Sequence, residues 1–274
     1  FKPSVKNNHL IGRGANDMKS SIACFVSAVN KFLKKGKFNG SISFLITGDE
    51  EGVAINGTKK VVDYLKKRKE KIDFCIVGEP TNPNKLGEMI KIGRRGSLTG
   101  KIEISGTQGH VAYPHLSNNP INTLISICKK LKEKKLDKGN KNFQPSNLEI
   151  TAINVENKAH NVIPGRAKAQ FNIRYNNFHN ASTLKKKINL VVKNACKKNK
   201  CKSKIEFIAN GDSFLTTPEK TILMAKRIIK KITKITPKFS TTGGTSDARF
   251  IRKIAPCLEF GLVNKTMHKV DECV

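Results

Sequence analysis

The sequence contains no tryptophan, only three tyrosines, and 21 acidic residues against 52 basic ones, which gives a formal net charge of +31. Single-stranded nucleic acids are held largely by bases that stack on aromatic side chains, and aromatic residues make up only 6% of this chain. The sequence also contains no motif for base recognition. We therefore interpret the excess of lysine as a solvated surface that attracts small anions, and we expect no specific nucleic-acid partner.

Long apolar runs and paired cysteines are missing as well. No stretch approaches the ~20 apolar residues that span a membrane, and none resembles a signal peptide. The seven cysteines form no CxxC pair, which favours free thiols in a reducing compartment. We therefore expect a cytoplasmic protein with no membrane partner. The 274 residues suffice for about two domains, and because the chain begins with Phe1 we interpret it as an internal piece of a longer protein.

Acidic residues are scarce, yet they recur beside predicted core elements. The hydrophobic stretch 41–47 predicts a buried strand that leads into Asp49-Glu50-Glu51, and Glu79 follows a second predicted strand, 73–77. The carboxyl ends of successive strands in an α/β sheet meet at one edge. We therefore expect these acids to lie close together.

Another acid, Asp17, precedes a helix predicted over 18–34 and so begins another βα unit. Taken alone, it would be interpreted as a helix N-cap, and Glu50 with Glu51 as a solvated acidic turn. Acids gathered at one place repel one another unless a cation holds them together. His268 adds an imidazole, and carboxylates with imidazole are the ligands of zinc and related ions. The pattern predicts a divalent-metal site.

The segment 96–209 has a different character from the rest of the chain. Its predicted elements are strand 97–106, helix 119–135, strands 146–155 and 165–175, helix 180–199 and strand 203–209. This βαββαβ order is typical of a ferredoxin-like α+β domain. We expect it to be inserted into an α/β domain with a mixed or parallel sheet, made of residues 1–95 and 210–274. After the insertion, Thr216-Thr-Pro218 opens a helix predicted to reach Thr233.

Several motifs resemble those of the dinuclear zinc aminoacylase/carboxypeptidase superfamily, and the likeness covers nearly the whole chain. They are Gly12-Arg-Gly-Ala-Asn-Asp17-Met-Lys19, Asp49-Glu50-Glu51, Gly78-Glu79-Pro80, Gly109-His110 and Gly243-Gly-Thr-Ser-Asp247. Longer stretches resemble the bacterial desuccinylases of that superfamily. They are Lys91-Ile-Gly-Arg94-Arg95-Gly-Ser97, His110-Val-Ala-Tyr-Pro-His115, Asn172-Ile-Arg-Tyr175 and Val263-Asn-Lys-Thr-Met-His268-Lys. The resemblance implies a metallopeptidase-like catalytic domain with an inserted dimerisation domain.

The same resemblance implies two zinc ions per subunit, with cobalt as a substitute. Asp17 would bridge the two ions, Glu51 and His268 would complete one site, and Glu79 would belong to the other. A further ligand motif, His-x-Asp, would lie upstream of Phe1 at the end of an earlier strand.

The resemblance also implies catalytic and substrate-binding residues. Glu50 would be the general base, and His110 would reach across a homodimer, formed through the inserted domain, to stabilise the oxyanion. The residues implied to line the pocket are Arg94, Arg95, Ser97, Tyr113, Asn161, Arg174, Gly244, Thr245 and Asn264. Arginine suits a small anionic substrate, because its fork binds carboxylates through paired, charge-assisted bonds. Two local alternatives stay open: Arg95 could pair with a nearby acid, and Asn161 could hold a turn.

The activity implied is an amide hydrolase that removes succinate from N-succinyl-LL-2,6-diaminopimelate in diaminopimelate and lysine biosynthesis. One alternative is an N-acyl amino-acid deacylase or dipeptidase of the same superfamily that takes another substrate. The other is a non-catalytic basic protein that binds its partner through the +31 charge.

Overall fold

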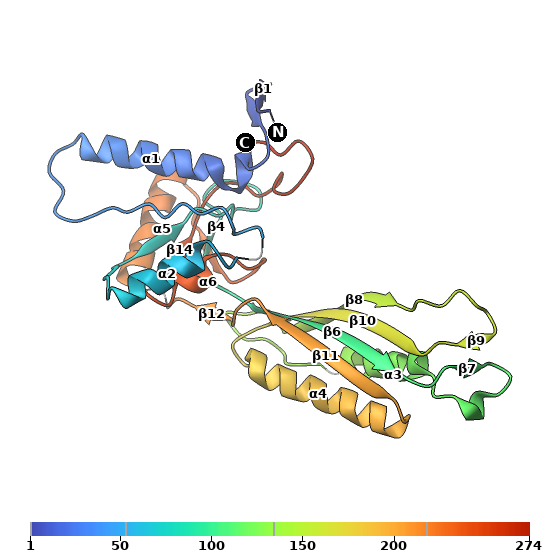
Figure 1. The fold of residues 1–274 in the computed structure, drawn as a ribbon. Helices are drawn as coiled ribbons and strands as arrows, with labels where there is room; N and C mark the ends of the chain where they lie inside the picture. The colour runs from blue at the N-terminus through green and yellow to red at the C-terminus, as the bar shows by residue number, and fades with distance from the viewer. Residues whose placement is uncertain (1, 53, 134, 218) are drawn as a thin grey trace. The chain divides into compact units, whose positions relative to one another are not determined.

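The computed structural model describes residues 2–52, 54–133, 135–217 and 219–274, and these form two compact units (Figure 1). The first unit contains the chain up to Arg94 together with Leu215–Val274, and the second contains Arg95–Phe214. The predicted opening of a helix at Pro218 lies outside the described residues, as does one residue of the helix predicted over 119–135.

The second unit is an antiparallel sheet with two helices. In spatial order its strands are β11 (Lys202–Ala209), β6 (Gly96–Ser105), β10 (Arg166–Tyr175) and β8 (Asn147–Asn154). Its helices are α3 (Pro120–Glu133) and α4 (Ala181–Lys198), and its shorter elements are β7 (Gly109–His110), η2 (Pro114–Leu116) and β9 (Val162–Ile163). The chain order β6-α3-β8-β10-α4-β11 confirms the predicted βαββαβ arrangement.

The core of this unit follows from the alternation of residues along its strands. Along β10, Ala167, Ala169, Phe171, Ile173 and Tyr175 are buried, while the residues between them are not. This period of two places one face of the strand in the core. Leu124, Ile127, Cys128 and Leu131 of α3 and the buried residues of α4 belong to the same hydrophobic cluster. Burial of that shared face is what selects the strand register.

Two glycines of β6 make room for the two aromatic side chains of β10. Gly100 is the register partner of Phe171, and Gly96 is the partner of Tyr175. A Cβ atom added at Gly100 would lie 2.1 Å from the Phe171 ring, and one added at Gly96 would lie 2.4 Å from the Tyr175 ring. Both rings therefore lie over the glycine backbone and are fully buried there.

We predict that Gly100→Ala destabilises the protein by about 1–3 kcal/mol, because the added methyl group overpacks the contact with Phe171. Denaturant unfolding measures the change. Gly165→Ala is the matched control, since its nearest neighbouring atom would be 3.8 Å away, and it should stay within about 0.5 kcal/mol of wild type. Equal stability of the two variants would contradict the packing argument.

The first unit has a mixed four-stranded sheet. In spatial order its strands are β13 (Lys238–Ser240), β4 (Met89–Lys91), β14 (Cys257–Glu259) and β3 (Cys75–Val77). The outer pairs are parallel, and the central pair is antiparallel. The other elements are β1 (Ser4–Lys6), β2 (His9–Ile11), η1 (Ala15–Lys19), α1 (Ser20–Leu33), α2 (Thr58–Lys67), β5 (Gly93–Arg94), α5 (Lys220–Thr233) and α6 (Ala248–Ile251); β12 (Phe214–Leu215) spans the boundary in sequence. Ile90, Ile222 and Leu258 lie at the centre of its core.

The strand predicted over 41–47 is wrong. These residues pair with no strand in the part of the chain that the structure describes, and their large side chains range from 41% exposed at Leu45 to 63% at Ile46. Hydrophobic residues favour a strand only where a neighbouring strand supplies hydrogen bonds and a face to pack on. Glu79 follows strand β3, whereas Asp17 lies in η1 and Glu50 follows residues 41–47, which form no strand in the described part of the chain. The prediction of three equivalent βα units is therefore also wrong.

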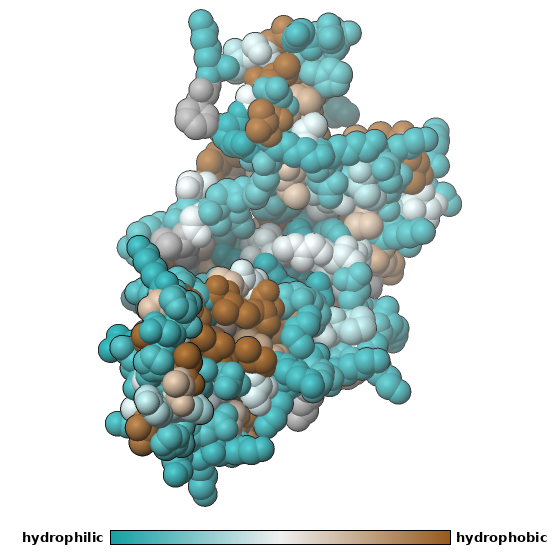
Figure 2. All heavy atoms as spheres, turned by 90° about the vertical axis from the view of Figure 1, so that its right-hand side faces the viewer, coloured by the Kyte–Doolittle hydropathy of each residue, from teal (hydrophilic) through white to brown (hydrophobic). Residues whose placement is uncertain are grey.

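The surface is mostly hydrophilic, as expected from the large number of charged residues. Figure 2 shows hydrophilic residues over most of the face drawn, with a smaller group of hydrophobic ones within it. Among the described residues, no helix has both the length and the apolar character needed to cross a bilayer. All seven cysteines lie within the described residues and are free.

Candidate metal centre

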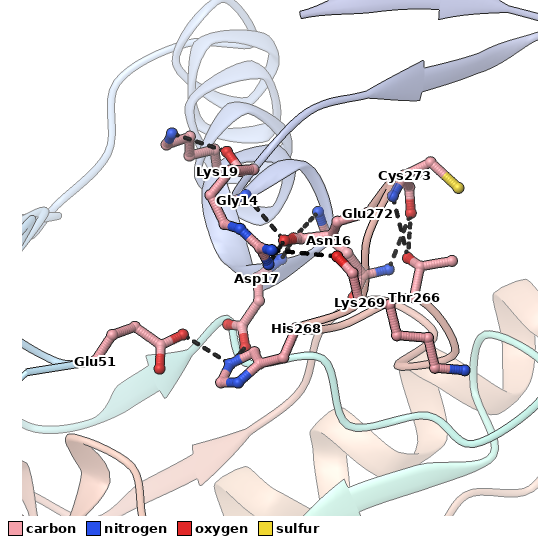
Figure 3. A network of polar contacts seen from close by, with 11 residues as sticks. Gly14, Asn16, Asp17, Lys19, Glu51, Thr266, His268, Lys269, Glu272 and Cys273 are labelled. Atoms are coloured by element: carbon pink, nitrogen blue, oxygen red, sulfur yellow. Dashed lines mark hydrogen bonds and ion pairs between the residues drawn. The ribbon is translucent and has the colours of Figure 1, made fainter. Parts of the chain in front are cut away.

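Three of the four predicted metal ligands come together in the first unit. One ligand atom from each of Asp17, Glu51 and His268 lies within 4.8 Å of the other two. His268 Nε2 is 3.2 Å from Asp17 Oδ2 and 2.8 Å from Glu51 Oε1. Figure 3 shows the three side chains pointing toward one another from three separate segments of the chain.

Two of these predicted ligands, Asp17 and Glu51, lie on a short turn and a loop. Asp17 lies in η1, which follows Gly14 in the left-handed region at φ 80° and leads into α1. Glu51 belongs to a loop that Asp49 braces, because Asp49 Oδ2 accepts bonds from the backbone N–H groups of Ile55 and Asn56 at 2.7 and 2.8 Å. This bond pattern is an example of an Asp side chain that fixes a turn.

Glu79 and Glu50 lie in the same electrostatic environment. Burial, reinforced by the negative charges of Asp17, Glu50 and Glu259, raises the pKa of Glu79 to about 9, although Arg94 opposes the shift. Burial, Asp247 and Glu51 raise the pKa of Glu50 to about 7. These mutual effects show that the acids are close enough to repel one another.

The donor set fits a divalent cation. Burial and the charge of Glu51 raise the pKa of Asp17. Partial burial alone would lower the pKa of His268, but the carboxylates of Glu51 and Asp17 raise it above its ordinary value. Oxygen ligands from acids with one imidazole nitrogen suit zinc and its neighbours.

Arg94, predicted to contact substrate, is 8% exposed and is held by Glu259, which is 1% exposed. Arg94 Nε donates to both Glu259 oxygens at 2.9 and 3.1 Å, and Nη2 bonds to Oε2. A Cβ atom at Gly243 would clash with Arg94 Nη1, so the absence of a side chain at Gly243 leaves room for the guanidinium group. The motif that contains Gly243 continues into the predicted residues Gly244 and Thr245, and a Cβ atom at Gly244 would meet nothing within 4 Å.

Asn264, the last predicted pocket residue of the first unit, is tied to the loop that follows β3. Its backbone N–H donates to the carbonyl of Asn82 at 2.9 Å. Asn82 in turn is completely buried, and its side chain donates to the carbonyl of Gly261. These bonds hold the segment that leads to His268 beside the segment that carries Glu79.

The remaining predicted residues belong to the second unit, where Arg95 and Arg174 lie near each other. Burial and then the positive charge of Arg174 lower the pKa of Arg95. Arg95 Nη1 donates to the carbonyl of Pro145 and to Asn147 Oδ1, at 3.1 and 2.8 Å. Two guanidinium groups held close together form an environment that favours a carboxylate.

His110 and Tyr113 form a second group in this unit. Their ring centroids are 5.9 Å apart, and His110 Nδ1 accepts a bond from the Ala112 backbone N–H at 3.0 Å. The backbone carbonyl of Asn161 accepts from Val111 N–H, so Asn161 holds this turn through its main chain.

Ser97, by contrast, lies inside the second unit. It is 1% exposed, and its hydroxyl oxygen accepts a bond from the Asn172 side-chain amide at 3.2 Å.

Three acids near the site were missed as site residues in the sequence analysis. Asp247 raises the pKa of Glu50, Glu259 holds Arg94, and Glu272 accepts bonds from the turn that carries Asp17. The available signal was that acids are scarce in this chain, and that Glu259 ends a hydrophobic run while Glu272 follows His268 by four residues.

The model of peptidase family M20/M25/M40 matches residues 1–274 of this sequence, and the chain belongs to that family. A relative from Pelagibacter ubique named succinyl-diaminopimelate desuccinylase is 68% identical over 275 residues, covering all of this chain and 72% of the relative. A relative of the same name from Parvibaculum lavamentivorans is 50% identical over 272 residues, covering 99% of this chain and 69% of the relative.

Solved structures show the same fold. The aminopeptidase PepT from Bacillus cereus superimposes with a TM-score of 0.80 at 19% identity, covering all of this chain and 71% of that one. The M20 metallo-carboxypeptidase Sso-CP2 from Sulfolobus solfataricus gives 0.74 at 18% identity, covering 99% and 74%. The predicted α/β metallopeptidase-like fold is therefore confirmed.

We predict that the metal-free protein becomes less stable as pH rises from about 5 to about 9. Glu79 binds its proton more tightly in the folded protein, with a pKa of about 9, than in the unfolded chain, where the ordinary value is 4.5. The unfolded state therefore loses its proton first, which favours unfolding by up to ~1.4 kcal/mol per pH unit. Denaturant unfolding across this range measures the slope. Glu79→Gln should flatten it, and an equal slope in the variant would contradict the assignment.

Proposed function

We propose that this protein is a metal-dependent amide hydrolase that removes succinate from N-succinyl-LL-2,6-diaminopimelate, a step in diaminopimelate and lysine biosynthesis. The observation that carries the proposal is the convergence of Asp17, Glu51 and His268 in a chain that is 68% identical, over its whole length, to a relative named succinyl-diaminopimelate desuccinylase. Membership of the M20/M25/M40 family supports the reaction class.

Two zinc ions per subunit, with cobalt as a substitute, suit these side chains. Asp17 would serve both ions, Glu51 and His268 would complete the ligands of one, and Glu79 would serve the other. The raised pKa of Glu79 supports this assignment, because carboxyls that repel one another gain most from a shared cation. When bound, such ions polarise the amide carbonyl and lower the pKa of water.

Glu50 is the proposed general base. It stands next to the ligand Glu51 in the chain, and its pKa of about 7 lets it exchange a proton near neutral pH. In this role Glu50 takes the proton of the attacking water and passes it to the leaving amine nitrogen. His110 is the proposed donor to the carbonyl oxygen as negative charge develops there.

Recognition of the substrate carboxylates is assigned to Arg95 and Arg174, because their guanidinium groups lie close together in the second unit. Arg94 is not assigned to the substrate carboxylates in the same way, because its guanidinium group already binds the Glu259 carboxylate. The other residues proposed to line the pocket are Ser97, Tyr113, Asn161, Gly244, Thr245 and Asn264. A small anionic substrate also agrees with the basic surface of the protein.

We further propose a cytoplasmic homodimer that forms through the domain 96–209, with residues 1–95 and 210–274 as the catalytic domain. Exposed apolar side chains near His110 support this surface: Val111 is 46% exposed, Tyr113 57% and Leu116 68%. Apolar side chains grouped in this way are typical of protein interfaces.

The substrate is tested by measuring zinc-dependent release of succinate from the N-succinyl diamino diacid and of acetate from N-acetylornithine. We expect a clear preference for the succinyl substrate. Equal rates would favour the N-acyl deacylase or dipeptidase alternative. Absence of zinc binding, together with salt-sensitive binding to nucleic acid, would favour the basic binding protein.

We predict that Glu50→Gln lowers kcat by about 10²–10⁴-fold, because the amide cannot accept the proton of the attacking water. Zinc content, measured by elemental analysis, should stay at the wild-type level, since Glu50 is not among the proposed ligands. Asp63→Asn is a suitable control, because Asp63 is an exposed acid of the same unit that pairs only with nearby lysines. A Glu50→Gln enzyme with normal kcat would remove the base from this role.

A further inference from the structure

Glu272 is buried at 2% exposure, and its carboxylate accepts hydrogen bonds from a single turn (Figure 3). Oε1 accepts from the backbone N–H groups of Asn16 and Asp17 at 2.9 and 2.8 Å. Oε2 accepts from Gly14 N–H at 3.1 Å and from Arg13 Nη1 at 2.8 Å. Four donors from residues 13–17 therefore converge on one side chain, and one of them is the amide of a proposed metal ligand.

The turn is shaped to receive an anion. Gly14 lies in the left-handed region at φ 80°, which turns the N–H groups of the residues around it toward one side. Successive backbone N–H groups arranged in this way form a concave anion-binding nest, and here the nest holds a carboxylate of the same chain. Burial alone would raise the pKa of Glu272, but the N–H donors of Asp17, Gly14 and Asn16, with Arg13, lower it. The charged form is therefore the form that the turn binds.

The same segment carries His268, four residues before Glu272. Arg13 Nη2 donates to the carbonyl of Lys269 at 3.2 Å, so the turn also reaches the residue next to His268. Thr266 Oγ1 donates to the carbonyl of Cys273 at 2.6 Å and accepts from its N–H, which closes the loop between them. Asn16 Nδ2 donates to the carbonyl of Val263 at 2.7 Å. One network thus joins the turn of Asp17 to the loop of His268.

Glu272 itself is placed to act indirectly. Both of its oxygens are already engaged by donors of the turn, and it is not a member of the group formed by Asp17, Glu51 and His268. Its bond to Asp17 N–H fixes the backbone from which the Asp17 side chain projects. Groups that orient metal ligands in this way commonly change metal affinity or activity by 10–100-fold when they are replaced.

We propose that Glu272 is a positioning residue: it fixes Asp17 for metal binding and couples the Asp17 turn to the loop that carries His268. This role rests on the proposed function, in which Asp17 and His268 hold the same metal pair. It adds a residue that neither coordinates the metal nor contacts the substrate. Its effect therefore appears in metal affinity and ligand geometry before it appears in any rate.

The test compares Glu272→Gln with Glu88→Gln in the intact protein. In Glu272→Gln one oxygen becomes an amide nitrogen that faces N–H donors, so two of the four bonds are lost. Glu88→Gln is the matched control, because Glu88 Oε2 also accepts two backbone N–H groups, from Asn84 and Lys85 at 2.9 and 3.0 Å, in a turn that holds none of the proposed ligands. The charge change is the same in both variants.

Two measurements are made on each metal-free protein, well below its unfolding temperature. Competition with a chromophoric chelator gives the zinc Kd, and the visible absorption of added cobalt reports the geometry of the ligands. We expect Glu272→Gln to bind zinc about 10–100-fold more weakly than wild type and to give an altered cobalt spectrum. Glu88→Gln should match wild type in both measurements. Wild-type zinc affinity and an unchanged cobalt spectrum in Glu272→Gln would overturn the positioning role.

A second variant covers the case in which Glu272→Gln does not fold. Arg13 is 50% exposed, and Arg13→Gln removes only one of the four donors, so a several-fold weaker zinc affinity with a shifted cobalt spectrum is expected. An unchanged affinity in Arg13→Gln would then overturn the proposal. A wild-type protein that binds no zinc is a separate result, because it refutes the metal centre of the proposed function and the positioning role falls with it.

Discussion

Repulsion between carboxylates is the constraint on which the centre of the first unit depends. Asp17, Glu50, Glu51 and Glu79 come from three parts of a strongly basic chain, and burial together with the charges of neighbouring acids raises the pKa values of Asp17, Glu50 and Glu79. A folded protein keeps such an arrangement only where a proton or a cation relieves it. In the metal-free protein, the pKa of Glu79 is raised to about 9, so a proton on that carboxyl supplies part of this relief. A divalent ion bound there would take the place of that proton, so metal binding and proton release would be linked.

Two other buried acids show the contrasting solution. Glu259 is surrounded by the Arg94 guanidinium and the Ser246 hydroxyl, and Glu272 by backbone N–H groups and Arg13. Strong donors replace the lost water around each carboxylate. The acids therefore differ in their surroundings. Glu259 and Glu272 are enclosed by hydrogen-bond donors, while Asp17, Glu50 and Glu79 lie close to other acids.

Much of this could be predicted from the sequence, and the successes share a cause. The βαββαβ unit was predictable because alternation along strands such as 165–175 is a local signal that burial enforces. Asp17, Glu51 and His268 were found because their residue types carry metal chemistry and sit in recognisable motifs. The buried strand predicted over 41–47 was wrong, because a hydrophobic run does not indicate which strand would pair with it.

Glu259 and Glu272 were missed for a related reason. Glu272 meets Asp17 across 255 positions, and Glu259 meets Arg94 across 165. No periodicity links residues so far apart, and a lone glutamate is usually interpreted as part of the solvated surface. Only the fold reveals that each one is enclosed by donors. Residues that orient a site are thus harder to predict than residues that bind a metal or a substrate, because all of their hydrogen bonds are made to other parts of the protein.

The basic surface and the acidic centre act at different ranges. Charges on exposed lysines are screened beyond a Debye length of about 8 Å at physiological salt, so they raise the local concentration of an anion without selecting it. Selection requires short-range geometry. The guanidinium groups of Arg95 and Arg174 lie near enough for the charge of Arg174 to lower the pKa of Arg95, and such a pair forms an environment that favours a carboxylate. The exposed lysines and the paired arginines therefore differ in what they can do, because the first only concentrate anions while the second discriminate among them by geometry.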